Sequence, residues 1–259
     1  MGNQNAFRLF ILFILASVAP LILGGCSTAG VTQKDRLESN LHYAVGASYY
    51  KKGDYINALQ QFLKARNHDP YSARNYNAMG MVYMVTYRQN KAISSFKKAV
   101  SLDKNFSDAY YNLALIYIMD KDYKNAGENL KLALANPFYE KPYQSYTLLA
   151  KIYIKEKKFS RAKRILLISR SLNKNYYLTY YYFGKLYLAT GKLDKSLKNF
   201  KESIDIEGVF LPGEYGRGVA YYKMNRIKKS KAIFEEICKQ DNESKYCQKS
   251  LKYLGKIKK

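Results

Sequence analysis

The chain has 259 residues and a formal net charge of +24, and it contains 27 tyrosines but only three cysteines and two histidines. These few cysteines and histidines, together with the absence of a glycine-rich phosphate loop, a nucleophile elbow or a paired acid motif, favour a binding protein over an enzyme. We therefore expect no catalytic residue, no metal, no cofactor and no small-molecule substrate.

Residues 1–25 have the pattern of a lipoprotein signal peptide. One positive charge, Arg8, precedes an apolar stretch at 9–25 that is shorter than the about 20 residues a membrane-spanning helix needs. The stretch ends in LGGC at 23–26, which resembles a bacterial lipobox, where small residues let a peptidase reach the bond before an acylated cysteine. We therefore expect a lipid such as palmitate on Cys26. An ordinary signal peptide that ends near a cysteine is the alternative.

In bacterial lipoproteins the residue after the lipidated cysteine influences sorting, and aspartate there tends to hold the protein at the inner membrane. Here that residue is Ser27, so the resemblance implies the periplasmic face of the outer membrane, with the lipid as the membrane contact. Residues 26–38 are predicted to be a lipidated, flexible tether, because they are small or polar and lack apolar periodicity. No later segment is expected to span a bilayer.

The positive charge alone could indicate a nucleic-acid partner, because lysine and arginine neutralise phosphates. The export signal argues against this partner, and the lysines are scattered through the chain rather than gathered into one stripe. We expect solvated helix faces and no nucleic acid. Attraction to anionic headgroups or to an acidic protein patch stays open.

A set of residue types recurs about every 34 residues through 39–244. Glycine or alanine lies three residues before a tyrosine, alanine or serine nine after it, and phenylalanine or leucine four further on. This period is typical of the tetratricopeptide repeat, a pair of antiparallel helices that stacks into a superhelix. We predict an all-α, right-handed superhelix of six such repeats, without a second globular core. The recurring tyrosines are Tyr49, Tyr83, Tyr117, Tyr153, Tyr187 and Tyr221.

Each recurring residue type is predicted to have one packing role. Small residues such as Gly46 and Ala58 let the two helices of a repeat approach closely, while the aromatic residues fill the space between neighbouring repeats. The predicted units are 39–72, 73–106, 107–140, 143–176, 177–210 and 211–244.

The C-terminal segment 245–259 is predicted to be a capping helix with a basic tail, because a terminal repeat needs its open face covered. Cys238 falls late in repeat six and Cys247 early in this helix. An even pair of cysteines in an oxidising compartment predicts a disulfide between them. Two unpaired thiols are the alternative.

The first helix of each repeat is expected to line a concave groove that binds a partner. In repeats one to three the groove positions are mainly apolar, aromatic or methionine, which suits an extended segment or an amphipathic helix. In repeats four to six the same positions are polar and basic, which favours an acidic partner. The alternative is that these side chains only pack against neighbouring helices. The N-terminal set is Tyr43, Tyr50, Asn77, Met81, Met84, Tyr111, Leu115, Ile118 and Met119, and the C-terminal set is Gln144, Thr147, Lys151, Lys155, Tyr181, Lys185, Tyr215, Tyr222 and Lys223.

One interval between the tyrosines is 36 residues rather than 34, because two residues are inserted between repeats three and four. The junction reads NPFYEKP at 136–142, and its two prolines predict an extended, stiff segment. A lipobox, six repeats and an N-P-x-Y-x-x-P junction together resemble the type IV pilus biogenesis lipoproteins of the PilF/PilW kind, over the whole mature chain. What this resemblance implies is a pilotin, a lipid-anchored protein that helps the outer-membrane secretin ring to localise or assemble.

Two other classes of function stay open. Outer-membrane protein insertion machinery also uses lipid-anchored helical repeats, and adaptors of peptidoglycan synthesis bind envelope enzymes. The proline-bracketed junction favours a pilus protein over both.

Overall fold

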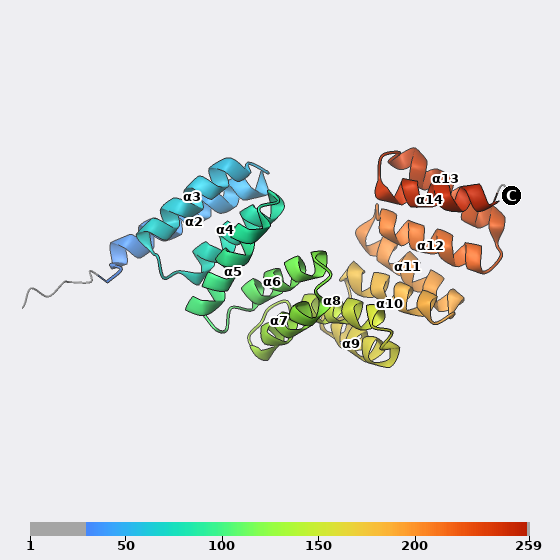
Figure 1. Cartoon of the computed structure of the whole chain (residues 1–259), viewed down its shortest axis with the longest axis horizontal. Helices are drawn as coiled ribbons and strands as arrows, with labels where there is room; N and C mark the ends of the chain where they lie inside the picture. The colour runs from blue at the N-terminus through green and yellow to red at the C-terminus, as the bar shows by residue number, and fades with distance from the viewer. Residues whose placement is uncertain (1–29, 258–259) are drawn as a thin grey trace, which may run out of the picture.

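A computed structural model describes residues 30–257, and in this part of the chain it contains thirteen helices and no strand. The predicted signal peptide, Cys26 and the last two lysines lie outside the described residues. Successive helices pack in pairs that follow a curved path from α2 to α14 (Figure 1). The predicted all-α tetratricopeptide superhelix is confirmed. The helices are α2 Gln33–Lys51, α3 Tyr55–His68, α4 Ala73–Val85, α5 Gln89–Leu102, α6 Ser107–Met119, α7 Tyr123–Ala135, α8 Pro142–Lys155, α9 Phe159–Leu172, α10 Tyr177–Ala189, α11 Leu193–Glu207, α12 Leu211–Lys223, α13 Ile227–Gln240 and α14 Lys245–Ile257.

The N-terminal boundary differs from the predicted tether. Helix α2 begins at Gln33, so residues 33–38 are helical rather than flexible. The cause is a capping box: the Asp35 backbone N–H donates to Oγ1 of Thr32, and the Asp35 carboxylate accepts from the Thr32 backbone N–H at 3.0 Å. Such a box satisfies backbone groups that would otherwise lack partners at the start of a helix.

Close packing within a repeat depends on a glycine of the first helix that lies against a phenylalanine ring of the second. A Cβ atom added to any of these glycines would lie only 2.5–2.8 Å from the ring, closer than real side chains approach. The rings themselves are almost completely buried. The pairs are Gly46–Phe62, Gly80–Phe96, Gly184–Phe200 and Gly218–Phe234.

Repeats three and four solve the same packing problem with different residues. Alanine replaces the glycine and leucine replaces the phenylalanine, in the pairs Ala114–Leu130 and Ala150–Leu166, and all four side chains are completely buried. Alanine adds a methyl group on the first helix, and leucine replaces the larger phenylalanine ring on the second. The total volume between the helices is thereby kept near a constant value, as a close-packed interior requires.

The recurring tyrosines connect one repeat to the next. Tyr83 packs against the buried clusters on both sides of it, which contain Phe62 and Phe96. Tyr117 and Tyr153 bridge the next two boundaries in the same way. The six tyrosines are partly rather than fully buried, and three of them, Tyr83, Tyr117 and Tyr153, each cover an interface between repeats.

Serine takes the place of the small alanine in repeats five and six without leaving a polar group unpaired. Oγ of Ser196 donates to the backbone carbonyl of Gly184 at 2.9 Å, and Ser230 makes the equivalent bond to Gly218. The bond compensates for burying the hydroxyl. Repeat six therefore keeps the same helix crossing although its sequence departs from the pattern.

The junction after repeat three is not helical, as predicted, but it turns at Pro137–Phe138 rather than running extended. Asn136 forms the turn: its side-chain oxygen accepts from the Phe138 backbone N–H at 2.9 Å, and its side-chain nitrogen donates to the Asn105 carbonyl. Tyr139 is 9% exposed and packs against Tyr110, whereas Phe138 is 88% exposed. The junction is thus anchored through one buried ring, that of Tyr139.

The C-terminal helix α14 covers the last repeat as predicted. Tyr253 stacks on Phe234 with ring centroids 5.0 Å apart, and Leu254 and Ile257 pack against the same buried cluster. A disulfide joins Cys238 of α13 to Cys247 of α14, with Cα atoms 4.6 Å apart.

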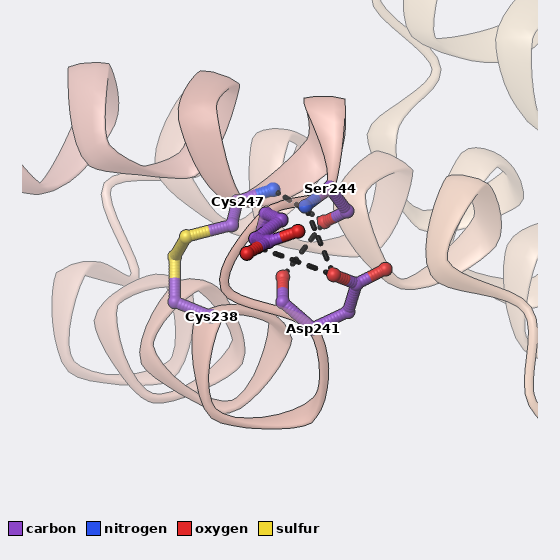
Figure 2. The surroundings of a disulfide bond; sticks show 5 residues. Cys238, Asp241, Ser244 and Cys247 are labelled. Atoms are coloured by element: carbon purple, nitrogen blue, oxygen red, sulfur yellow. Dashed lines mark hydrogen bonds between the residues drawn. A yellow bond between two sulfur atoms is a disulfide. The ribbon is translucent and has the colours of Figure 1, made fainter.

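The turn between the two cysteines is itself held by hydrogen bonds (Figure 2). Oγ of Ser244 accepts from the Cys247 backbone N–H at 3.0 Å, and the Asp241 carboxylate accepts from the Ser244 backbone N–H. Closing so short a loop stabilises the terminal helix by roughly 2–3 kcal/mol in the chain-entropy model.

The glycine–phenylalanine contact predicts an unusual cost for adding a methyl group. Gly80→Ala should lower the free energy of unfolding by about 1–3 kcal/mol through overpacking, although alanine is the better helix former. Gly80→Ala combined with Phe96→Leu, the pairing of repeats three and four, should recover part of the loss. Urea denaturation followed by circular dichroism measures both.

The matched control for this prediction is Gly127 of α7, where an added Cβ would meet no atom within 4 Å. Gly127→Ala should raise stability by up to about 1 kcal/mol. Equal effects at Gly80 and Gly127 would contradict the packing argument.

The junction predicts opposite outcomes for two adjacent aromatic residues. Tyr139→Ala should cost about 3–5 kcal/mol, because it removes a buried ring. Phe138→Ala should change stability by no more than about 0.5 kcal/mol, because that ring is exposed. Similar effects of the two substitutions in urea denaturation would show that the turn is not anchored by Tyr139.

Candidate functional site

The first helices of the repeats lie closest to one another and form the inner face of the superhelix. Neighbouring first helices are in contact along the stack, as in α2 with α4, α8 with α10 and α10 with α12, whereas the contacts within the described chain include no comparable pair of second helices. Helices α6 and α8, on either side of the junction, approach each other less closely than these pairs. The two inserted residues therefore divide the inner face into an N-terminal and a C-terminal half.

The two tyrosines expected in the groove of repeat one are half-buried and already have neighbours. The Tyr43 ring packs against Phe62, with centroids 5.5 Å apart, and the Arg74 guanidinium lies 3.7 Å from its centroid. Tyr50 meets Tyr55 edge to face at 5.5 Å. The outer face of each ring is all that a partner could contact here.

Two of the predicted groove residues belong to the interior, so those predictions are wrong. Ile118 is 7% exposed and packs in a core cluster with Leu148 and Leu149. Asn77 is 8% exposed, and its side-chain oxygen accepts from the Asn112 amide at 2.9 Å. Asn77 thus joins adjacent first helices, and its side-chain oxygen already has a hydrogen-bond partner.

Two methionines form the accessible part of the N-terminal half. Met119 is 60% exposed, and with Met84, Ile116 and Tyr87 it lines a pocket of about 140 Å³. Methionine side chains adapt to partners of different shape, which suits a binding surface. The remaining predicted residues, Met81, Tyr111 and Leu115, are partly buried against the neighbouring clusters.

The C-terminal half contains a pocket of about 310 Å³ with positive charge above an apolar floor. Four lysines from α8, α10 and α12 line it, and none of them forms an ion pair in the part of the chain that the structure describes. We call it the lysine pocket. Its lining residues are Lys151, Ile154, Lys155, Tyr182, Lys185, Leu188, Ala189 and Lys223.

The charged forms of two lysines in the lysine pocket are destabilised by burial and by repulsion from neighbouring lysines. Burial lowers the pKa of Lys185 below its usual value of 10.5, and repulsion by Lys155, Lys151 and Lys249 lowers it further. Burial also lowers the pKa of Lys151, with smaller contributions from Lys155 and Lys245. An anionic group in the pocket would relieve this repulsion, so the pocket is suited to a carboxylate-bearing partner.

The apolar floor of the lysine pocket was not among the predicted residues. Ile154 lies three residues after Lys151, and Leu188 three after Lys185, so each shares a helix face with its lysine. This three-residue spacing is the feature of the sequence that could have predicted the floor residues. Thr147, by contrast, was expected in the groove and is completely buried, bonded to Ser169 and Thr179 at 2.8 and 3.0 Å.

Comparison with known proteins supports the repeat assignment. Models of the tetratricopeptide repeat match residues 73–106 and 95–128. These matches cover repeat two and, in repeat three, the first helix and the beginning of the second. The chain has tetratricopeptide repeats.

Similarity extends to proteins of type IV pilus assembly. The chain is 26% identical over 174 residues to the type IV pilus assembly protein PilF of Pseudomonas aeruginosa, which covers 65% of this chain and 68% of PilF. The PilF structure superposes with a TM-score of 0.72 at 16% identity, covering 84% of this chain and 98% of that one. The crystal structure of PilW, a type IV pilus biogenesis factor, gives 0.73 at 17% identity, with coverage of 82% and 98%.

Two longer proteins match only in part. The chain spans 10% of the length of the bimA protein of Emericella nidulans and 19% of a BBS4 homolog of Drosophila melanogaster. None of the helices in residues 30–257 is long and apolar enough to cross a membrane.

The lysine pocket predicts that removing one of its positive charges weakens the binding of acidic ligands. Lys185→Met keeps the apolar stem but removes the charge, so it should weaken binding of a labelled glutamate-rich peptide about tenfold, since a charged hydrogen bond contributes about 1.5–3 kcal/mol. Lys198→Met, at an exposed position on α11, is the matched control and should bind like the unaltered protein. Fluorescence anisotropy measures both.

The same binding should depend on pH in a defined direction. Because the pKa values of Lys151 and Lys185 are lowered, these groups lose their charge at a lower pH than ordinary lysines. Affinity for the peptide should therefore fall as the pH rises, before it reaches 10.5. Constant affinity up to that pH would contradict the role of these lysines.

Proposed function

We propose that this chain is an outer-membrane lipoprotein that assists type IV pilus assembly as a pilotin, by binding the secretin and helping it to localise or assemble. The observation that carries the proposal is the match to PilF, which extends over 174 residues and spans 68% of that protein. The shared fold, which covers 98% of the PilF and PilW chains, agrees with it. So do the lipobox and the junction motif in the sequence.

The proposed anchor places the repeats close to the membrane. Helix α2 begins seven residues after Cys26, and that length of chain reaches at most about 25 Å when extended. A lipid on Cys26 would therefore hold the first repeat within about that distance of the bilayer surface. Such a position suits a protein that meets its partner at the membrane.

The inner face offers two kinds of contact to one partner segment. The methionine pocket around Met84 and Met119 suits an apolar side chain, and the lysine pocket suits acidic groups farther along the same segment. Positive charge on the inner face would also speed encounter with an acidic segment. We infer an amphipathic, acidic segment of the secretin as the bound element.

The test is a deletion of the gene, followed by complementation. Secretin multimers should disappear from the outer membrane on deletion and return with the unaltered gene. Cys26→Ser should restore them poorly, because the protein would lose its lipid. Membrane fractionation and immunoblotting of the secretin measure this outcome, and normal multimers in the deletion strain would rule out the pilotin role.

A substitution on the inner face tests whether this face, rather than another surface, binds the partner. Met119→Glu introduces a charge on the exposed part of the inner face and should impair complementation without unfolding the chain. Leu132→Glu, at a position on the second helix α7 that is 50% exposed, is the matched control and should complement fully.

A further inference from the structure

The only two histidines of the chain lie side by side in repeat one. His42 is on α2 and His68 is the last residue of α3, and their rings stack with centroids 5.5 Å apart and planes inclined by 18°. They are 26 residues apart in the sequence, so only the packing of the two helices brings them together.

A carboxylate completes the cluster. Glu38 lies one turn before His42 on the same face of α2, and Glu38, His42 and His68 each offer a ligand atom within 4.8 Å of the other two. All three side chains are partly buried. The sequence predicted no metal, but the fold brings a carboxylate close to both histidines.

A hydrogen bond orients the imidazole of His42, and a carboxylate lies close to that of His68. Nδ1 of His42 lies 2.8 Å from the Gln61 side-chain oxygen, so the proton is on Nδ1 and the lone pair is on Nε2. One oxygen of Asp35 is held by the capping box with Thr32, and the other lies 3.9 Å from Nδ1 of His68. Metal-binding histidines commonly have an oxygen acceptor at the second nitrogen, which fixes the tautomer and the ring.

The internal repeats show that this cluster is particular to repeat one. The position of His42 is tyrosine in repeats two to five, and the position of His68 is Leu, Asn, Leu, Ile or Gln in repeats two to six. Packing of the repeat therefore requires neither histidine. Both histidines occur together in the one repeat whose first helix, α2, also carries Asp35 and Glu38.

We propose that Glu38, His42 and His68 bind one divalent transition-metal ion of the zinc class, with a fourth position left to water. Two imidazoles and one carboxylate are a donor set that zinc accepts in tetrahedral geometry. At bond lengths of about 2.0–2.1 Å the donor atoms must draw together by roughly 1 Å, which side-chain rotation achieves. The ion would tie α2 to α3 at the open N-terminal end of the stack.

The experiment uses the full-length chain in detergent, first stripped with a chelator and then titrated with Zn²⁺. We expect saturable uptake of one zinc per chain, measured by elemental analysis, and slower amide exchange in α2 and α3 when the ion is bound. Co²⁺ in place of Zn²⁺ should give the visible absorption of a four-coordinate site. No saturable uptake would overturn the proposal.

Three substitutions locate the ion. His42→Tyr introduces the tyrosine of repeats two to five, His68→Gln introduces the glutamine of repeat six, and Glu38→Gln removes the charge. Each substitution should weaken zinc binding at least about tenfold. Glu128→Gln, at an exposed carboxylate on α7, is the matched control and should bind as the unaltered protein does. Gln61→Ala should weaken binding by about 10–100-fold, as loss of an orienting hydrogen bond does.

All of these variants retain Cys26, so weaker zinc binding in any of them is due to the substituted residue and not to that cysteine. Circular dichroism checks that each variant is folded. If His42→Tyr fails to fold, His68→Gln decides the result. Zinc affinity unchanged by the folded histidine variants would overturn the proposal.

Discussion

The contact between a small residue on the first helix and a large one on the second is the constraint on which the rest of the structure depends. In four repeats it joins glycine to phenylalanine, and in two it joins alanine to leucine. The spacing is constant because both residues must lie where the helices cross. Once this distance is set, the tyrosine that follows each small residue is placed at the boundary with the next repeat. The 34-residue period is therefore a consequence of packing at two kinds of interface.

The sequence predicted the helix pairs well, because their determinants recur locally. It predicted the exposure of individual groove residues less well. Asn77, Ile118 and Thr147 occupy positions that face the groove in a regular superhelix, yet here they contact the neighbouring first helix. Whether such a side chain is accessible depends on the step between repeats, which is a long-range property. The pairing of His42 with His68 has the same cause, since it depends on the register of two packed helices.

The irregular step after repeat three has chemical consequences as well as geometric ones. Helices α6 and α8 approach each other less closely than other neighbouring first helices, and partly buried tyrosines occupy the region around the junction. Tyr143 and Tyr176 meet edge to face at 4.9 Å, and burial raises the pKa of nearby Tyr111 to about 12. Burial also raises the pKa of Tyr176, so Tyr111 and Tyr176 stay neutral between the apolar half of the inner face and the lysines of the other half. The partner segment proposed above would change from apolar to acidic where it crosses the junction.

A stack of repeats is stabilised by neighbours, so its two end units have the least support. At the C-terminal end this deficit is offset twice, by the apolar face of α14 and by the disulfide that holds it. At the N-terminal end α2 is longer than any other helix in residues 30–257 and begins with a capping box. Its outer turns nevertheless carry exposed Leu37 and Leu41. A tether on Cys26 would pull on this end, so the histidine–carboxylate cluster lies where a link between α2 and α3 would resist fraying most effectively.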